Sequence, residues 1–398
     1  MQQKQLSSLD AAFPASVGVL GATGSVGTQA FDVIRAQKIP VDFLTAHRNV
    51  ALAESQIRAL SPKVYVMTDD DSARDLAVRV KDTDTKVYGA DALDDVIRAS
   101  SATAVIHSIL GEAGLAPLIS CIDAGKRIGL ANKESLVIAG DLVMKRAKET
   151  GAKIIPVDSE HSAIFQCLDG KDPREIRSIL LTASGGPFFG YTREQLARVT
   201  KADALAHPTW KMGAKITVDS ASLMNKGFEV IEAVRLFGVL PEQIEVVVHR
   251  ESIIHSAVEY IDSAVIAQMG APDMRLCVQY ALTYPHRREG LTKRLSLTDV
   301  GKMTFFLPDT ETFPLLALAF SAISDGGAVP ATLNAANEIA VEAFLKEELS
   351  FLGIFEIVSE TVAALASEAK GCSTLESRIS MDRRARGVAG SLIKSRRN

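Results

Sequence analysis

Short apolar runs alternate with amphipathic helical patterns over the first 157 residues of this 398-residue chain. The segments 25–36, 49–60 and 135–149 place apolar residues at helical spacing. The runs that are typical of buried strands lie at residues 15–20, 41–45, 63–67, 104–107, 127–130 and 153–157. Strands that alternate with helices predict a mostly parallel sheet with helices on both faces. The expected fold class is therefore α/β, with an N-terminal Rossmann-like parallel sheet domain over residues 1–157.

Two different patterns follow this region. Between residues 158 and 285, four short strand patterns separated by hairpin-length turns predict a central α+β domain with a largely antiparallel sheet. These strand patterns lie at residues 176–183, 245–249, 256–260 and 264–268. Residues 286–312 are rich in charge and in helix breakers, which predicts a linker. Residues 313–398 carry four helical patterns, at 313–324, 331–348, 353–369 and 374–397, which predict a C-terminal four-helix bundle.

Composition limits the partners and the compartment. The 44 Lys and Arg residues nearly balance the 48 Asp and Glu residues, so no global charge favours nucleic acid or a membrane surface. The longest clean apolar run, 315–320, is far shorter than the roughly 20 residues of a membrane span. The cysteines are scattered, with no CxxC pair, at positions 121, 167, 277 and 372. We therefore expect a cytoplasmic protein with reduced thiols and with neither nucleic acid nor a membrane as its partner.

A glycine-rich segment, Gly21–Gly27 (GATGSVG), directly follows the first predicted strand and opens the first predicted helix. Glycines there let the backbone approach a pyrophosphate, whose charge then lies at the positive end of the helix. The spacing is GxxGxxG rather than GxGxxG, so the strand–loop–helix context carries the nucleotide-binding prediction. A tight turn without a ligand is the alternative.

The end of the second predicted strand indicates which nucleotide would bind. A site for NAD usually has an acidic residue about twenty positions after the glycines, and Thr45–Asn49 contains none. Arg48 can pair with a 2′-phosphate and Asn49 can donate a hydrogen bond to it, which favours NADP(H). The alternative is that Arg48 is a solvated loop cation.

Two short segments combine oxygen donors with a cation. Asp158 and Glu160 lie two apart at the end of a predicted strand, so in extended geometry both carboxylates project to one side. Asn225 and Glu229 are one turn apart on a predicted helix, with Lys226 beside them. Such a set suits Mg²⁺ or Mn²⁺ together with an anionic substrate. Solvated carboxylates are the alternative, but ligands of open α/β sheets bind at this end of a strand.

Further polar segments suit the anionic end of a substrate. Thr182–Phe188 has small residues and a serine after a predicted strand, and Asp219–Lys226 supplies hydroxyl, amide and ammonium donors. Trp210, the only tryptophan, lies in a loop that we interpret as a lid over about 184–214. The respective alternatives are a Gly-Pro turn, a helix-capping run and a buried anchor for loop packing.

Lys133 follows another parallel strand, beside the expected position of the nicotinamide. It can hydrogen-bond a reacting hydroxyl or hold Asp158. A plain turn with solvated charges is the alternative.

Six motifs together give a specific resemblance: GATGSVG, LANKESLV, PVDSEHSAIFQ, LTASGGPF, HPTWKMGAKITVDSASLMNKGFEVIEA and LNAANEIAVEAFL. From about residue 15 to its end, the chain resembles the 1-deoxy-D-xylulose 5-phosphate reductoisomerase family. The resemblance implies an NADP-dependent oxidoreductase and isomerase with Mg²⁺ or Mn²⁺ that acts on a phosphorylated sugar. It implies a retro-aldol/aldol rearrangement and reduction by NADPH to 2-C-methyl-D-erythritol 4-phosphate, for isoprenoid biosynthesis by the non-mevalonate route. It also implies a homodimer.

The resemblance assigns roles position by position. It implies that the catalytic residues are Lys133 and the metal ligands, which are Asp158, Glu160 and Glu229. It implies that the substrate is bound by Lys133, Ser159, Glu160, Ser184, His207, Trp210, Ser220, Asn225, Lys226 and Glu229. It implies that NADPH is bound by Thr23, Gly24, Ser25, Val26, Arg48, Asn49, Asn132, Glu134 and Gly213. His47 departs from the glycine common in the family, and we interpret the LNAANE run as pinning helices together.

Two other classes of protein remain as alternatives. A semialdehyde-type dehydrogenase can carry a similar glycine loop but requires a nucleophilic cysteine, for which only Cys121 and Cys167 are near. A non-enzymatic NADPH sensor would have no use for three convergent carboxylates.

Overall fold

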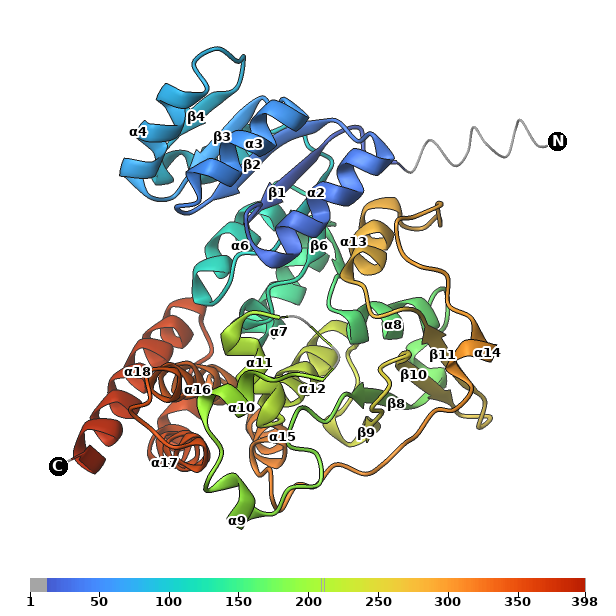
Figure 1. The fold of residues 1–398 in the computed structure, drawn as a ribbon, viewed down its shortest axis with the longest axis vertical. Coiled ribbons are helices and arrows are strands. Elements are labelled where there is room, and N and C mark those ends of the chain that lie inside the picture. Colours follow the sequence, from blue (N-terminus) through green and yellow to red (C-terminus); the bar gives the residue numbers. More distant parts are fainter. Residues whose placement is uncertain (1–12, 209, 211, 398) are drawn as a thin grey trace. The chain divides into compact units, whose positions relative to one another are not determined.

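The protein is described by a computed structural model over residues 13–208, 210 and 212–397 (Figure 1). The chain divides into two compact units that interrupt one another in sequence. The first unit comprises the residues up to Ser135, Lys145–Ser162 and Asp273–Arg294. The second unit comprises Leu136–Met144, Ala163–Pro272 and the residues from Leu295 onward.

The first unit is built on a seven-stranded sheet in the order β4-β3-β2-β1-β5-β6-β7, in which all neighbours pair in parallel. The strands are β1 (Val17–Leu20), β2 (Val41–Ala46), β3 (Val64–Met67), β4 (Lys86–Tyr88), β5 (Ala104–His107), β6 (Arg127–Leu130) and β7 (Lys153–Pro156). Successive strands move outward from β1 on one side and then restart with β5 on the other. The switch point between β1 and β5 is where such sheets bind ligands. The prediction of a Rossmann-like parallel sheet is confirmed.

Helices of the first unit follow the strands in alternation. They are α2 (Ser25–Gln37), α3 (Val50–Leu60), α4 (Asp70–Arg79), α5 (Leu93–Ala99), α6 (Leu115–Asp123), α7 (Glu134–Thr150) and α13 (Met274–Thr283), with short 3₁₀ turns η1 (Ala90–Ala92) and η2 (Glu112–Gly114). The middle of α7, Leu136–Met144, is grouped with the second unit. The predicted segments 25–36 and 49–60 correspond to α2 and α3.

Helix α13 packs in the first unit, against α2 and β6, although the sequence-based boundary at residue 285 grouped it with the central domain. The Arg127 guanidinium donates hydrogen bonds to the carbonyls of Leu282 (2.9 Å) and Tyr284 (2.8 Å) at the end of this helix. A Cβ atom at Gly129 would lie 3.2 Å from Cβ of Ala281, so a larger residue would crowd the helix against β6. Packing partners, rather than sequence neighbours, decide where this helix belongs.

A buried carboxylate stabilises the start of β2. Asp42 is 5% exposed and accepts hydrogen bonds from the hydroxyl (2.6 Å) of Ser100, from the backbone N–H (2.9 Å) of Ser101 and from its hydroxyl (2.8 Å). Nζ of Lys63 lies 2.5 Å from the same carboxylate. Burial alone would raise the pKa of Asp42, but Lys63 and the two serines outweigh it and lower the pKa to about 2.

We expect Asp42→Asn to destabilise the protein by on the order of 2 kcal/mol at neutral pH. The folded pKa of about 2 lies below the ordinary value of 3.8, so this stabilisation is present above pH 3.8 and is lost as the pH falls through 2. Urea denaturation between pH 7 and pH 2 measures the effect. The variant should lose less stability than the parent over the acid limb, and parallel curves would contradict the assignment.

The second unit contains a four-stranded sheet in the order β11-β10-β8-β9. Its strands are β8 (Ile176–Ala183), β9 (Ile244–Val248), β10 (Ile254–Tyr260) and β11 (Val265–Met269). Strand β10 is antiparallel to both β8 and β11, whereas β8 and β9 are parallel. The prediction of a largely antiparallel sheet is therefore confirmed.

Further helices lie along the chain between residues 173 and 300 of this unit and carry many of the predicted site residues. They are α9 (Arg193–Leu196), α10 (Lys201–Leu205), α11 (Ala214–Ala221), α12 (Met224–Phe237) and α14 (Leu297–Val300), with 3₁₀ turns η3 (Pro173–Glu175) and η4 (Pro241–Gln243). Helix α8 (Ser159–Cys167) begins in the first unit and continues into the second. The predicted linker 286–312 contains α14 and an isolated antiparallel bridge between Val248 and Phe306.

The C-terminal helices, orange to red in Figure 1, are α15 (Leu315–Asp325), α16 (Val329–Leu345), α17 (Phe351–Lys370) and α18 (Leu375–Arg397). Helix α16 is the centre of this group and packs against the other three. It is buried along most of its length, and Pro330 lies in its first turn, where a missing N–H costs nothing. The predicted C-terminal helical bundle is confirmed. None of the described helices is both long enough and apolar enough to cross a membrane.

Candidate active site

The glycine-rich loop joins β1 to α2 and leaves no room for side chains at two positions. Gly21 has a φ of 85°, and a Cβ atom there would lie 2.8 Å from the carbonyl oxygen of Ser108. A Cβ atom at Gly27 would lie 2.2 Å from the carbonyl oxygen of Gly21. Gly24 occupies the N-cap of α2 and provides no capping side chain. The first backbone N–H groups of this helix can therefore serve an anion.

Arg48 and Asn49 lie at the carboxyl end of β2, as predicted. Nε of Arg48 donates to Oδ2 of Asp69 over 3.0 Å, while the Arg48 side chain remains 71% exposed. Asn49 caps α3, since its Oδ1 accepts from the N–H of Leu52 at 3.1 Å. Hydrogen bonds from Ser72 and the charge of Arg48 lower the pKa of Asp69 to about 2, so the ion pair persists at neutral pH. The guanidinium is thus oriented but still accessible.

His47, where the resemblance implied a glycine, neighbours this pair. Its Nδ1 lies 3.0 Å from Oγ1 of Thr68, and its side chain is exposed.

Asn132 links two loops at the carboxyl edge of the parallel sheet. Its side-chain amide is 2.7 Å from the carbonyl of Ile109, 3.0 Å from that of Gly111 and 3.0 Å from Oε2 of Glu134. Its Oδ1 accepts from the N–H of Ser135 at 2.9 Å, which caps the start of α7. Asn132 therefore has a structural role, and its contact with a nucleotide stays a prediction.

The sequence predicted that Asp158 and Glu160 lie together in extended geometry at the end of a strand. In the structure they do not. Strand β7 ends at Pro156 and α8 begins at Ser159, so Asp158 precedes the helix and Glu160 lies in its first turn. The carbonyl of Asp158 already accepts a helical hydrogen bond from Ser162 at 2.8 Å. The expectation of extended geometry was wrong, because the helix starts immediately after the strand.

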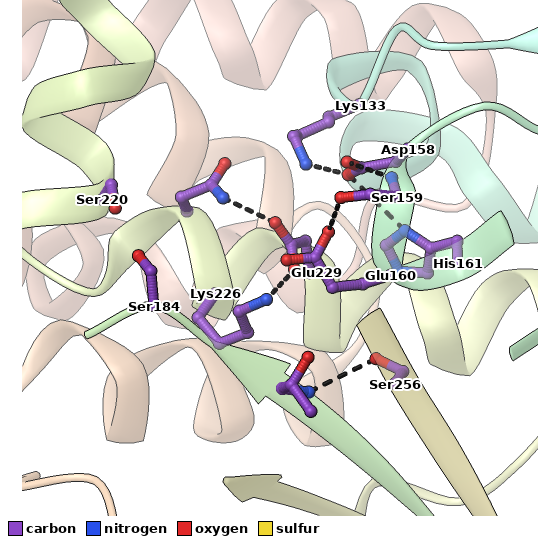
Figure 2. Close-up of polar contacts among 12 residues, drawn as sticks. Lys133, Asp158, Ser159, Glu160, His161, Ser184, Ser220, Lys226, Glu229 and Ser256 are labelled. Atoms are coloured by element: carbon purple, nitrogen blue, oxygen red, sulfur yellow. Dashed lines mark hydrogen bonds and ion pairs between the residues drawn. The ribbon is translucent and has the colours of Figure 1, made fainter. Parts of the chain in front are cut away.

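Lys133 forms an ion pair with Oδ2 of Asp158, which confirms one of its two predicted roles (Figure 2). Beside this pair, the hydroxyl of Ser159 donates to Oε2 of Glu160 over 2.5 Å. Burial alone would raise the pKa of Asp158, but the nearby Lys133 ammonium and His161 hold it well below its usual range. Asp158 is therefore an anion that is largely shielded from water.

His161 is a neighbour of this site that sequence reasoning missed. It is fully buried, and its Nδ1 lies 3.6 Å from Oδ2 of Asp158. Figure 2 shows the ring directed toward that carboxylate. The sequence did contain a signal for this contact. His161 lies three residues after Asp158, and at the start of a helix that spacing places both side chains on one face.

Helix α12 presents a second polar group, in the second unit. Glu229 is 1% exposed, and its Oε1 accepts from the Asn225 amide at 2.5 Å while Oε2 pairs with the ammonium of Lys226. The predicted shared face is therefore confirmed. A Cβ atom at Gly227 would lie 2.7 Å from Cβ of Ala319, so α12 is closely packed on α15. Tight packing gives these side chains a rigid base.

Three segments of the second unit meet at His207. Its Nε2 lies 3.1 Å from the hydroxyl of Ser184 and 3.1 Å from that of Ser220. Its Nδ1 accepts from the backbone N–H of Trp210 at 2.9 Å. The ring proton of the neutral imidazole therefore resides on Nε2, facing the serines. Burial, aided by the charge of Arg250, lowers the pKa of His207 and favours this neutral form.

Trp210 is partly buried, with its ring centroid 6.2 Å from that of His255. The predicted lid, 184–214, includes Thr209 and Lys211, which lie outside the described residues. Closure of this segment stays a prediction. Gly213 occupies the N-cap of α11.

Arg250, two residues after the end of β9, was not recognised in the sequence as a site residue. Its Nη1 donates to the carbonyls of Ser184 and Gly186, both at 2.7 Å, and its guanidinium lies 5.0 Å from the ring centroid of Phe189. Gly185 and Gly186 both have positive φ, 76° and 64°. Arg250 thus holds a glycine turn that side-chain-bearing residues would strain. Every residue has a backbone carbonyl, so the sequence gives no sign of which ones Arg250 contacts. Sequence analysis therefore missed Arg250.

The sequence matches known protein families along most of its length. A family model described as 1-deoxy-D-xylulose 5-phosphate reductoisomerase matches residues 17–140, and two models of C-terminal domains of that enzyme match 154–237 and 269–388. The chain belongs to the 1-deoxy-D-xylulose 5-phosphate reductoisomerase family.

Relatives in this family span nearly the whole chain. The reductoisomerase of Phocaeicola vulgatus is 48% identical over 382 residues, covering 95% of this chain and 99% of the relative. That of Exiguobacterium sibiricum is 50% identical over 380 residues, covering 94% and 98%.

Two solved reductoisomerase structures show the same fold. The Zymomonas mobilis enzyme in complex with NADPH is 41% identical, with a TM-score of 0.90 over 96% of this chain and 100% of that one. A complex with NADPH, fosmidomycin and magnesium is 39% identical, with a TM-score of 0.89 over 95% and 98%.

Membership of the reductoisomerase family disfavours the semialdehyde-dehydrogenase alternative, and the cysteines agree. Cys121 and Cys167 are both buried. Burial raises the pKa of the Cys121 thiol to about 12, so it is protonated at neutral pH. Neither residue lies in a setting that produces a nucleophilic thiolate.

Proposed function

We propose that this chain converts 1-deoxy-D-xylulose 5-phosphate to 2-C-methyl-D-erythritol 4-phosphate, using NADPH and a divalent metal, in isoprenoid precursor biosynthesis. The observation that carries the proposal is the near full-length match to reductoisomerases, at 48% identity over 95% of the chain. Two polar groups in the two units support it. One contains Lys133 and Asp158, and the other contains Lys226 and Glu229.

We propose Asp158, Glu160 and Glu229 as the ligands of one Mg²⁺ or Mn²⁺ ion. Carboxylate oxygens are the donors that both ions prefer, and Asp158 is held in its ionised form. Oδ1 of Asn225 is buried and accepts no hydrogen bond from the residues that the structure describes, which leaves an unused oxygen atom beside Glu229. When bound, the metal would stabilise negative charge that develops on the substrate oxygens.

The phosphate of the substrate is proposed to bind in the second unit. The hydroxyls of Ser184 and Ser220 each lie 3.1 Å from Nε2 of His207, which supports this placement. Asn225 and Lys226 would add an amide and an ammonium donor. Such mixed donors around one dianion give both affinity and orientation.

The reacting end of the substrate would lie at the polar group of the first unit. Lys133, Ser159 and Glu160 would hold the carbonyl and hydroxyls, with Lys133 donating to an oxygen that gains negative charge. The segment that carries Trp210 would exclude water and retain the branched aldehyde between rearrangement and reduction.

NADPH is proposed to bind along the carboxyl edge of the parallel sheet. The loop of Thr23–Val26 at the start of α2 would receive the pyrophosphate. Arg48 and Asn49 would bind the 2′-phosphate, and NADPH would supply the hydride. Asn132, Glu134 and Gly213 are the remaining proposed contacts.

The test is oxidation of NADPH by the purified protein with 1-deoxy-D-xylulose 5-phosphate, with and without EDTA. We expect turnover that EDTA abolishes and that added Mg²⁺ or Mn²⁺ restores. Activity that persists after complete metal removal would refute the metal assignment. Stoichiometric NADPH binding without any turnover would instead support the sensor alternative.

Arg250→Met tests the support of the phosphate site. We expect KM for 1-deoxy-D-xylulose 5-phosphate to rise about tenfold, because the Ser184 turn loses two hydrogen bonds from a charged donor. Steady-state kinetics measure this effect. Arg177→Met is the matched control, since Arg177 lies on the exposed surface of β8 and pairs with Glu259. Equal KM values in both variants would contradict this role for Arg250.

A homodimer is proposed, with β11 as the candidate contact. Val265 and Ile266 are 55% and 42% exposed, and within the described chain β11 pairs with β10 alone. At the opposite edge, Phe306 already pairs with β9. An open apolar edge strand invites pairing with a second copy. Light scattering should give about twice the 42.6 kDa chain mass, and Ile266→Lys should yield monomers. A parent protein that is monomeric would refute the proposal.

The expected compartment and partners also stay predictions. The four cysteines are free, which agrees with a cytoplasmic protein. The near balance of 44 basic and 48 acidic residues agrees with a small-molecule substrate rather than nucleic acid or a membrane.

A further inference from the structure

The LNAANE run lies in α16 and makes a specific contact with another helix. Asn337 is fully buried, and its Nδ2 donates to Oδ1 of Asp219 over 2.7 Å. Asp219 lies on α11 and is 2% exposed. This contact supports the interpretation that the LNAANE run pins helices together. The helix that it holds, α11, carries the predicted site residue Ser220.

The Asp219 carboxylate joins α11 to the C-terminal helices. Its Oδ2 lies 3.0 Å from Nζ of Lys215, one turn earlier on the same helix, whereas its Oδ1 receives Asn337 from α16. Removal of the Asn337 amide would leave one oxygen of a buried carboxylate without this donor, which is unfavourable. Helix α11 has 8 residues, too few to be stable by itself. Its position therefore depends on such tertiary contacts.

Ser220 directly follows Asp219 and has little freedom to move. Its hydroxyl lies 3.1 Å from Nε2 of His207. A Cβ atom placed on Gly186 would lie only 2.6 Å from the carbonyl oxygen of Ser220. The end of α11 therefore packs closely against the turn that follows Ser184. A small shift or rotation of α11 would therefore change the separation between Ser184 and Ser220 (Figure 2).

We propose that Asn337 is a positioning residue for the phosphate end of the substrate site. By holding Asp219, it fixes the Ser220 hydroxyl in register with Ser184 and His207. The C-terminal helices thus contribute to substrate recognition without touching the substrate. The inference rests on the proposed function, because it assumes that Ser220 binds the substrate phosphate.

Asn337→Ala is the first test, with Asn334→Ala as its matched control. Asn334 is equally buried on α16 but donates to Glu338 of its own helix at 3.1 Å. We expect Asn337→Ala to raise KM for 1-deoxy-D-xylulose 5-phosphate about tenfold, with kcat changed less than about twofold. Asn334→Ala should lower the melting temperature without changing KM. A rise in KM confined to Asn337→Ala would support positioning over general destabilisation.

An exchange of the two side chains provides a second test that does not require a cavity. In D219N/N337D the amide and the carboxylate swap places, and the same hydrogen bond can form in the opposite direction. We expect each single substitution, D219N or N337D, to raise KM. The double variant restores this hydrogen bond but not the ion pair with Lys215, so we expect its KM to be lower than that of either single variant. Additive single effects in the double variant would overturn the proposal.

Ser220→Ala separates failure of this inference from failure of the proposed function. If Ser220→Ala raises KM while Asn337→Ala behaves like Asn334→Ala, the phosphate site stands and the positioning role is refuted. If Ser220→Ala leaves KM unchanged, the phosphate assignment is refuted and this inference with it.

Discussion

Replacing Glu229 by glutamine is expected to reduce turnover at limiting Mg²⁺ by about a thousandfold or more, while NADPH still binds. Glutamine keeps the shape of the side chain but removes the negative charge that a divalent ion requires. The same change removes one anionic partner of the buried Lys226 ammonium. The glycine loop and Arg48 belong to the other unit of the chain, so nucleotide affinity should change less than about twofold.

Steady-state NADPH oxidation across a Mg²⁺ titration, with fluorescence titration of NADPH, measures both effects of Glu229→Gln. Glu245→Gln is a suitable control, because Glu245 is an exposed residue of β9 in the same unit. A near-normal rate for Glu229→Gln at limiting Mg²⁺ would exclude Glu229 as a metal ligand.

For Arg48→Ala, we expect KM for NADPH to rise by about ten- to a hundredfold and KM for NADH to change little. The guanidinium is oriented by Asp69 and is 71% exposed, so it can form a charge-assisted pair with a 2′-phosphate. NADH lacks that phosphate. The alanine variant also leaves the Asp69 carboxylate near the proposed position of the 2′-phosphate, which would further disfavour a phosphorylated cofactor.

Kinetics with both nucleotides test the assignment of Arg48. Arg58→Ala is the control. Arg58 is a cation on the surface of α3 in the same unit, and it pairs with Asp82. Equal effects of Arg48→Ala on NADPH and NADH would refute a contact with the 2′-phosphate.

Most of the fold was predictable because buried strands leave continuous apolar runs. The predicted runs 104–107 and 127–130 coincide with β5 and β6. Strand β4 (Lys86–Tyr88) was missed because it is a short, largely exposed edge strand with no apolar run. The placement of α13 was also missed, since periodicity shows that a helix is amphipathic but not which surface it covers.

The candidate site was predictable where its residues are close in sequence. Asn225, Lys226 and Glu229 share one helix, so their spacing predicted their contact. The relation between Asp158 and Glu160 was not predictable, because the start of α8 decides it. Arg250 acts on carbonyl groups far along the chain, so no local pattern reveals it. The LNAANE run indicated that helices are pinned together, but not that Asn337 contacts Asp219.

The interrupted connectivity of the two units has a consequence during synthesis on the ribosome. The parallel sheet obtains its last strand, β7, only after Leu136–Met144 of the other unit has been made, and α13 arrives after Ala163–Pro272. The surface of the sheet that α13 covers therefore stays exposed to solvent until synthesis has passed Arg294. Neither unit is one continuous segment, so neither can be obtained by simple truncation of the chain.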